Sequence, residues 1–226
     1  MHSGLAKLPL VLLLVLPAAE AFAQTAAGFV DAATAVQGIV VDMRYFGSHN
    51  FVGTRIDGYE APRCLLTRQA ATALAAVESD LESRGLGLKV FDCYRPARAV
   101  AHFVRWARDL ADLQGKAEFY PEADKRNLFK EGYIASRSGH SRGSTIDITL
   151  VTRQDGRDLD MGSPFDFFGP RSWPSYRGVS EEARNHRALL AGAMRRRGFG
   201  PYEREWWHFT LAREPFPNTY FDFAVR

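Results

Sequence analysis

Alternating apolar and polar residues predict the strands of this chain. Residues 144–150 alternate cleanly, with aliphatic residues at 146, 148 and 150 on one face and polar residues at 145, 147 and 149 on the other, which is typical of a half-buried strand. Residues 38–45 and 88–94 are rich in β-branched and aromatic residues and predict two more strands. The aromatic stretch 204–211 predicts a last strand near the end of the chain.

Helical spacing of apolar residues predicts three helices between these strands. Leucines and alanines recur at helical spacing over residues 65–84, and Gly85 follows as a C-cap. Pro96 suits a helix start, with the pattern running to about Leu113, and Ser180 caps a helix ending near Gly198. Helices and strands mix without regular βαβ alternation, which favours an α+β fold with a central, mainly antiparallel sheet. No repeat or long linker divides residues 24–226, so we expect one domain there.

The first residues have the pattern of an export signal. Lys7 precedes an apolar run over residues 8–16, and the small-x-small sequence 21–23 predicts cleavage before Gln24, which makes residues 1–23 a signal peptide. An uncleaved anchor or a buried helix is the alternative. The run is shorter than the roughly 20 apolar residues of a membrane span, so we expect no stable membrane insertion after cleavage.

Charge and cysteine content narrow the choice of partners and compartment. The net charge is +3 over 226 residues, and losing Lys7 and Glu20 with the signal leaves it at +3, too small an excess to indicate a nucleic-acid partner. The two cysteines, Cys64 and Cys93, favour a disulfide in an exported chain, with two buried free thiols as the alternative. Nothing in the sequence indicates an oligomeric state.

Two of the six histidines lie in patterns that can carry metal chemistry. His140 sits in a turn-forming stretch, 138–143, just before the strand whose polar face carries Asp147. His208 closes the sequence Glu-Trp-Trp-His, residues 205–208. Two imidazoles and one carboxylate are the three nitrogen or oxygen ligands common in catalytic zinc sites, where a fourth position stays open for water. The other histidines (His2, His49, His102 and His186) have no ligand pattern around them.

Glu205 is the candidate proton carrier beside such a metal. A carboxylate that is not a ligand can take a proton from water and pass it to a leaving amine. Residues three apart lie on opposite sides of a flat strand, so we expect a bulge or kink that brings Glu205 and His208 to the same site. The alternative for this stretch is a core aromatic cluster with a hydrogen-bonded histidine.

Several motifs in one order give the chain a family resemblance. Residues 138–147 (SGHSRGSTID) with 205–208 (EWWH) resemble the D-alanyl-D-alanine dipeptidases of glycopeptide resistance, a group of zinc D,D-peptidases. The resemblance extends through 42–45 (DMRY), 94–96 (YRP), 161–167 (MGSPFDF) and 217–223 (PNTYFDF). Gly139 departs from the serine common at its position.

The resemblance implies a role for each matching residue. One zinc ion per chain would be held by His140, Asp147 and His208, with Glu205 as general acid/base. Arg95 would stabilise the negative oxygen of the tetrahedral intermediate, a role that suits a fixed guanidinium. The implied substrate-binding residues are Asp166, which would receive the free amino group, Ser138 and Tyr45.

The expected activity is therefore hydrolysis of the small dipeptide D-Ala-D-Ala to two D-alanines in the turnover of cell-wall peptides. The export signal together with the resemblance predicts a periplasmic location. A zinc D,D-carboxypeptidase acting on longer wall peptides is the alternative enzyme, and a non-catalytic zinc module that binds wall peptides is the alternative of another class. A serine D,D-peptidase is disfavoured, because no Ser-x-x-Lys occurs in the chain.

Overall fold

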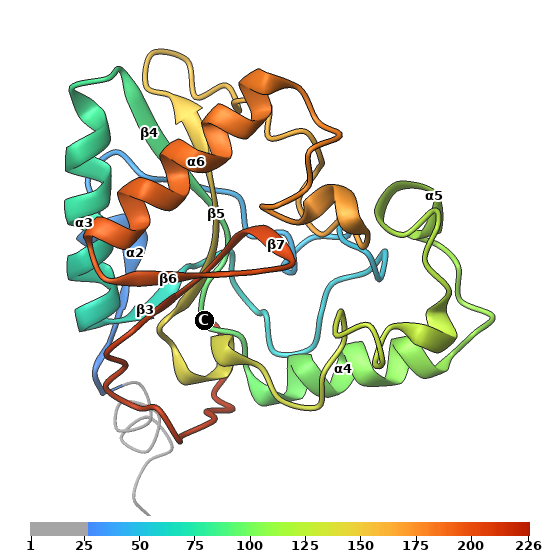
Figure 1. The fold of residues 1–226 in the computed structure, drawn as a ribbon. Coiled ribbons are helices and arrows are strands. Elements are labelled where there is room, and N and C mark those ends of the chain that lie inside the picture. Colours follow the sequence, from blue (N-terminus) through green and yellow to red (C-terminus); the bar gives the residue numbers. More distant parts are fainter. Residues whose placement is uncertain (1–26) are drawn as a thin grey trace, which may run out of the picture.

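A five-stranded sheet forms the centre of the computed structural model, which describes residues 27–226 (Figure 1). Its strand order is β2-β4-β5-β7-β6. The strands are β2 (Val40–Val41), β4 (Leu86–Asp92), β5 (Thr145–Thr152), β6 (Phe199–Tyr202) and β7 (Glu205–Leu211). Only β2 runs parallel to its neighbour, and the other three pairings are antiparallel. The predicted α+β class and mainly antiparallel sheet are confirmed. The predicted signal peptide, residues 1–23, lies outside the described residues.

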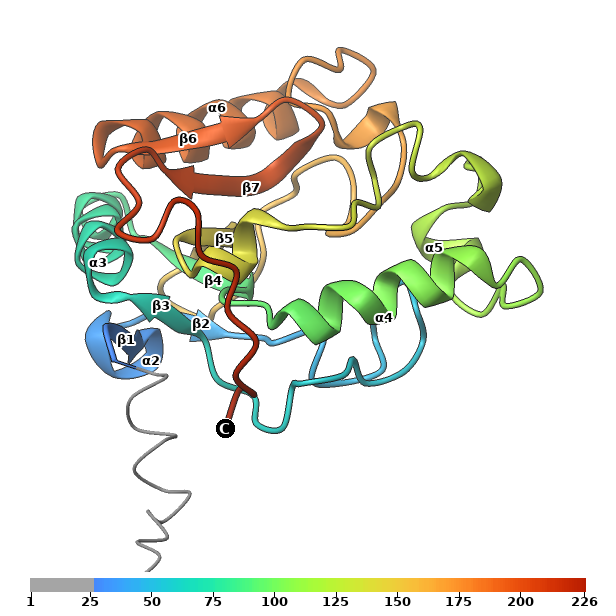
Figure 2. The ribbon, with the colours of Figure 1, turned by 90° about the horizontal axis from the view of Figure 1, so that it is seen from below.

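Two long helices pack side by side on the sheet. They are α3 (Arg68–Glu82) and α6 (Glu181–Arg196), and both contact the strands (Figure 1). Figure 2 shows α4 (Ala97–Arg108) on the opposite side, with the strands between it and α6. The smaller elements are β1 (Phe29–Asp31), α2 (Ala32–Ala35), β3 (Leu65–Thr67), α5 (Lys116–Phe119) and the short 3-10 turns Lys125–Asn127, Gly139–Arg142 and Pro170–Ser172. Among the described residues, no helix is long and apolar enough to cross a membrane.

Capping explains where the main helices begin. The Ser180 hydroxyl accepts from Ala183 N at 3.0 Å, so α6 starts where the sequence predicts. The predicted helix from residue 65 starts later, because residues 65–67 form β3 and Thr67 caps α3 by accepting from Ala70 N. Gly85, with φ 68°, lies just past the end of α3, and its left-handed backbone suits glycine.

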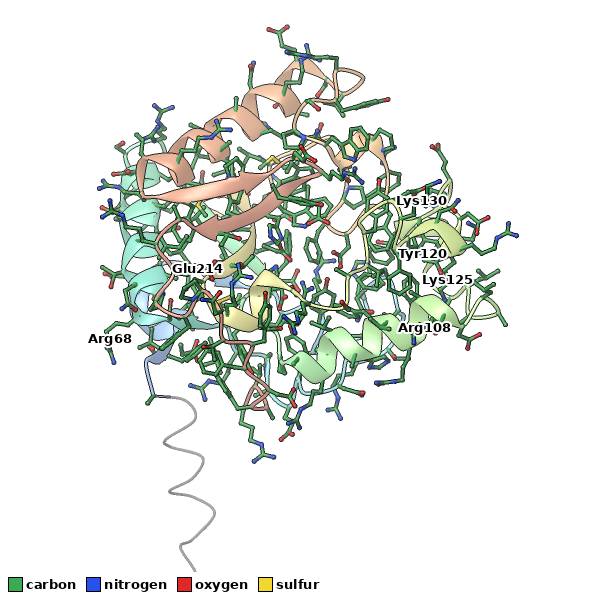
Figure 3. The ribbon with its side chains drawn as sticks, turned by 60° about the horizontal axis from the view of Figure 1, so that its bottom comes forward. Arg68, Arg108, Tyr120, Lys125, Lys130 and Glu214 are labelled. Atoms are coloured by element: carbon green, nitrogen blue, oxygen red, sulfur yellow. A yellow bond between two sulfur atoms is a disulfide. The ribbon has the colours of Figure 1, made fainter. Side chains whose placement is uncertain are left out.

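The predicted helix 96–113 is shorter in the structure. It ends at Arg108, with Asp109 at its C-cap, and Leu110 and Leu113 are each 51% exposed instead of forming its last turns. Lys125 holds the chain that follows, because its buried ammonium donates to the carbonyls of Asp109 (2.7 Å) and Asp112 (2.6 Å). Figure 3 shows Lys125 beside Arg108 and Tyr120 at this far end of α4.

One strand prediction needs correction, and one strand of the central sheet was not predicted. The strand expected over residues 38–45 is only two residues long as β2, although Asp42 N and Arg44 N continue to bond to carbonyls of the neighbouring strand. The strand β6 was not predicted, because it contains Gly200 and Pro201, which are unfavourable in strand interiors and tolerated here at the sheet edge.

The predicted disulfide between Cys64 and Cys93 is confirmed. It joins the start of β3 to the end of β4, with the two Cα atoms 5.2 Å apart, inside the usual range for a bridge. Both half-cystines are fully buried. The bridge therefore ties the segment that begins α3 to the strand that leads into the site described below.

Candidate active site

All eight site residues expected from the sequence line one cavity of about 300 Å³. Its lining comes from Arg95 just past the end of β4, from β5, β7 and the start of α4, and from the loops around residues 132–140 and 166. The lining residues include Tyr45, Arg95, Ser138, His140, Asp147, Asp166, Glu205 and His208. Segments far apart in the sequence therefore meet at one polar centre inside an aromatic wall.

Strand pairing and a short turn position the three expected ligands. Asp147 on β5 is the direct cross-strand partner of His208 on β7, so the sheet register sets their separation. His140 lies in the 3-10 turn Gly139–Arg142, which begins with the Ser138 hydroxyl accepting from His140 N at 3.3 Å. The turn closes on Gly143, whose φ of 79° is a conformation that favours glycine.

The three donor atoms form a nearly equilateral triangle. His140 Nε2 lies 3.3 Å from Asp147 Oδ1 and 3.3 Å from His208 Nδ1, and the third side, between His208 Nδ1 and Asp147 Oδ1, is 3.1 Å. Bonds of 2.0–2.1 Å in a tetrahedral zinc site put neighbouring ligand atoms about 3.3 Å apart. The triangle therefore has the size that one zinc ion needs.

The surroundings of this triangle also fit a cation. Asp147 is 2% exposed, and its Oδ1 has no hydrogen-bond partner among the described residues. His140 Nδ1 lies 2.7 Å from the carbonyl of Cys93, and because a carbonyl only accepts, the proton must sit on Nδ1. When Nδ1 carries the only ring proton, Nε2 is the free donor atom, and it faces both Asp147 and His208. Two imidazoles and a carboxylate suit zinc among the divalent ions.

Glu205 lies beside the triangle without belonging to it. Its Oε2 is 3.5 Å from His208 Nδ1, so the two side chains point to the same side despite lying three apart on β7. The expected bulge is present: Pro201 pairs with Phe209 and the next residue, Tyr202, with Glu205, so residues 206–208 have no partner on β6. Burial first, and then the charge of Asp147, raises the pKa of Glu205 to about 7, which suits a group that exchanges protons near neutral pH.

Arg95 is held rigidly at the other side of the triangle. Its Nε and one terminal nitrogen each lie 2.9 Å from Asp92 Oδ2, and that terminal nitrogen is 3.6 Å from Asp147 Oδ2. The guanidinium also lies over the rings of Tyr45 (5.0 Å) and Phe103 (5.1 Å). With 13% of its side chain exposed, it faces the cavity as a fixed, permanently charged donor.

Asp92 is a site residue that the sequence reasoning missed. Its fully buried carboxylate accepts from Tyr59 Oη at 2.6 Å, binds Arg95 and lies 3.2 Å from His140 Nδ1. A β-bulge near residue 91 sets it opposite Asp147. The available signal was an aspartate inside the apolar strand VFDCY, because a buried carboxylate needs partners.

Asp166 lines the same cavity from the segment between β5 and α6. It is 5% exposed, accepts from Tyr45 Oη at 2.9 Å, and has a left-handed backbone with φ 60°. Burial first, and then the charge of Asp147, raises its pKa well above the ordinary value. A positively charged group placed beside it would favour the carboxylate form.

Ser138 and Gly139 shape the turn that carries His140. Ser138 is half-buried, and its hydroxyl caps the turn while it also lines the cavity. A Cβ on Gly139 would lie 2.8 Å from Thr145 Oγ1, so a serine there would require that hydroxyl to move. The absence of a side chain at Gly139 therefore leaves space for the Thr145 hydroxyl at the start of β5.

The other histidines of residues 27–226 lie outside the site, and His2 lies outside the described residues. His49 pairs with Glu118 at 2.7 Å on the surface, His102 lies 3.2 Å from Asp57, and His186 lies 2.8 Å from the carbonyl of Asp160. Among the described residues, the one group of three or more His, Cys, Asp or Glu side chains with metal-binding spacing is His140, Asp147 and His208.

Comparison with known proteins gives a consistent result. A family model described as Peptidase M15, D-ala-D-ala dipeptidase, matches residues 25–226. A D-alanyl-D-alanine dipeptidase of Enterococcus faecalis is 40% identical over 88% of this chain and 98% of its own length. One of Escherichia coli is 34% identical over 80% of this chain and 83% of its own.

One solved structure is more distantly similar. A vancomycin resistance D,D-pentapeptidase in complex with Zn(II) is 13% identical and aligns over 70% of this chain and 78% of its own, with a TM-score of 0.40. A likeness of that size carries no inference about fold or metal.

Proposed function

The chain belongs to the D-Ala-D-Ala dipeptidase family of peptidases, and from that premise we propose that it hydrolyses D-Ala-D-Ala to two D-alanines with one zinc ion per chain. The observation that carries the proposal is the zinc-sized triangle of donor atoms, with Glu205 and Arg95 on either side of it. His140, Asp147 and His208 would hold the metal. When bound, zinc lowers the pKa of a coordinated water to about 7 and polarises a carbonyl.

Glu205 transfers the proton, and Arg95 stabilises the negative charge that develops on the substrate. The Glu205 carboxylate takes a proton from the attacking water and then gives it to the amine that leaves, so one group serves as base and acid. Arg95 donates to the carbonyl oxygen as that oxygen gains negative charge. Because Asp92 already fixes its guanidinium, little reorganisation is needed at that moment.

The remaining residues select the substrate. A free ammonium placed beside Asp166 and Tyr45 would pair with a buried carboxylate that has no cationic partner within ion-pair distance among residues 27–226. The Ser138 hydroxyl, which still has hydrogen-bonding capacity, would contact the bound dipeptide. The buried position of Asp166 leaves little room for an acylated amine. This favours a dipeptidase over a carboxypeptidase that acts on longer peptides.

We also infer export and a periplasmic site of action. The apolar segment of residues 8–16 with its small-x-small cleavage pattern supports removal of residues 1–23. The Cys64–Cys93 disulfide supports an oxidising compartment. Substrate there would be wall-derived dipeptide, which connects the activity to turnover of cell-wall peptides.

The test is release of free D-alanine from D-Ala-D-Ala by purified residues 24–226, with and without a chelator. We expect chelator-sensitive release that falls by about 10²-fold or more in Glu205→Ala, with zinc content unchanged. Glu203→Ala is the matched control, because that carboxylate is 81% exposed on the same hairpin.

Two outcomes would favour the alternatives. Faster cleavage of N-acetyl-D-Ala-D-Ala than of the free dipeptide would indicate a carboxypeptidase. Tight zinc and peptide binding without cleavage of either substrate would indicate a binding module.

A further inference from the structure

A buried arginine closes the loop that carries Asp166. This Asp166 loop, residues 161–173, runs between β5 and α6 and has no regular structure except its last 3-10 turn. Among the described residues, Asp166 is the one non-glycine residue with a positive φ. Such a conformation is unfavourable for a side chain with a Cβ and persists only where the surroundings impose it.

Arg187 on α6 binds both ends of the Asp166 loop through main-chain carbonyls. Its Nε donates to Met161 O at 2.6 Å, one terminal nitrogen to Trp173 O at 2.9 Å, and the other to Arg171 O at 2.8 Å. All three guanidinium nitrogens are used. The entry and exit of the loop are therefore held together by one side chain.

The position of Arg187 makes these contacts unusual. It is 5% exposed and shares the buried face of α6 with Ala183, Leu190 and Met194, where an apolar residue would continue the pattern. Among the described residues, no carboxylate lies within ion-pair distance of it. Burial lowers its pKa to about 10, so it keeps its charge and its donors at neutral pH. A buried charge is costly, and here the loop carbonyls compensate it.

Serine contacts hold the middle of the same loop. Ser172 Oγ donates to Phe167 O at 2.6 Å, and Ser163 Oγ lies 3.1 Å from Ser172 Oγ. Trp206 Nε1 on β7 donates to Ser163 Oγ at 2.9 Å, which ties the loop to the strand of Glu205 and His208. With the ends joined and the middle supported, the backbone at Asp166 has little freedom.

We propose that Arg187 is a positioning residue for recognition of the substrate's free amino group. By closing the Asp166 loop it holds Asp166 in its left-handed conformation, with the carboxylate in the cavity against Tyr45. This proposal rests on the dipeptidase function proposed above. It extends the binding machinery to a residue that touches neither substrate nor metal.

The test compares Arg187→Met with Arg184→Met. Methionine keeps much of the volume and removes the donors. Arg184 is the matched control, because it lies on the same helix and donates to the carbonyls of Val179 (2.5 Å) and Arg177 (3.2 Å), outside the Asp166 loop. Hydrogen exchange of the backbone amides is measured by mass spectrometry. KM and kcat are measured for D-Ala-D-Ala in samples of equal zinc content, well below the unfolding temperature.

We expect Arg187→Met to speed exchange within residues 161–173 and to raise KM about tenfold or more, with kcat changed less. Preference for the free over the N-acetylated dipeptide should fall with it. Arg184→Met should speed exchange only near residues 177–179 and leave KM unchanged. Arg187→Lys, which keeps the charge and part of the donor set, should fall between wild type and Arg187→Met, and it replaces Arg187→Met if that variant does not fold.

Unchanged exchange in the loop, or a KM shift equal to that of Arg184→Met, would overturn the proposal. A parallel loss of kcat, zinc and stability would also overturn it, by assigning Arg187 to general stability. If the wild-type protein does not cleave the dipeptide, the proposed function fails, while the exchange measurement still decides whether Arg187 holds the loop.

Discussion

Removing the disulfide should lower the free energy of unfolding by an amount that follows from the length of the loop that the bridge closes. The bridge joins residues 29 apart in sequence. The loop-entropy relation gives about 12 cal/mol/K for a loop of that size, or about 3.6 kcal/mol at 25 °C. Replacing both half-cystines by alanine, in Cys64→Ala/Cys93→Ala, should lower the free energy of unfolding by that amount.

The assay is urea unfolding of zinc-loaded protein, followed by circular dichroism. A domain of this size has an m-value of about 2 kcal/mol/M, so the midpoint should fall by roughly 1.8 M. Because either single substitution already removes the bridge, Cys64→Ala and Cys93→Ala should each lose nearly as much as the double variant.

Two results would contradict this reasoning. A midpoint shift below roughly 0.5 M would mean that the constraint on the unfolded chain is not the main contribution of the bridge. Additive losses in the two single variants would place the effect in local packing, since both sulfur atoms are buried. Zinc content is measured in every variant, because the carbonyl of Cys93 accepts the hydrogen bond from His140.

Three further predictions concern single side chains. Arg95→Met should lower kcat about 10²–10³-fold with zinc retained, measured by steady-state D-alanine release; an unchanged kcat would remove its oxyanion role. Asp166→Asn should raise KM for the free dipeptide and leave N-acetylated substrate little affected, and equal effects on both would argue against an amine site. Burial raises the pKa of the Glu78 carboxyl, which lies beside Arg153 and Glu82, above its ordinary value of 4.5. The contribution of this group to the free energy of unfolding is therefore complete below that pH and declines as pH rises through the pKa of the folded state. The stability advantage of wild type over Glu78→Gln should therefore shrink as pH rises above about 4.5 in urea titrations; a growing advantage would contradict this.

The sequence predicted the central elements of the fold because their patterns are local. The alternation over residues 144–150 and the cap at Ser180 are both present in the structure. It failed where tertiary context overrides local preference. Residues 65–67 have helical spacing and still form a strand, because they pair with β1. Residues 109–113 leave the helix and are held by Lys125.

The site residues that belong to a sequence motif could be predicted. The site residues whose role depends on contacts with distant segments could not. The ligand and acid/base residues stand in recognisable motifs, whereas Asp92 and Arg187 stand inside apolar patterns of a strand and a helix. Both are charged groups whose partners come from distant segments: Tyr59 and His140 for one, loop carbonyls for the other. A charge in a predicted buried face is the signal that would have found them.

The cross-strand pairing of Asp147 with His208 sets a folding order for the site. Both residues belong to neighbouring strands, but 61 positions separate them in the chain, so the pair exists only after β5 and β7 have found each other. The entropy cost of closing the intervening chain must be met before such a pairing can stabilise the fold. A newly made or unfolded chain therefore lacks the metal-binding geometry, and its metal affinity arises together with the completed sheet.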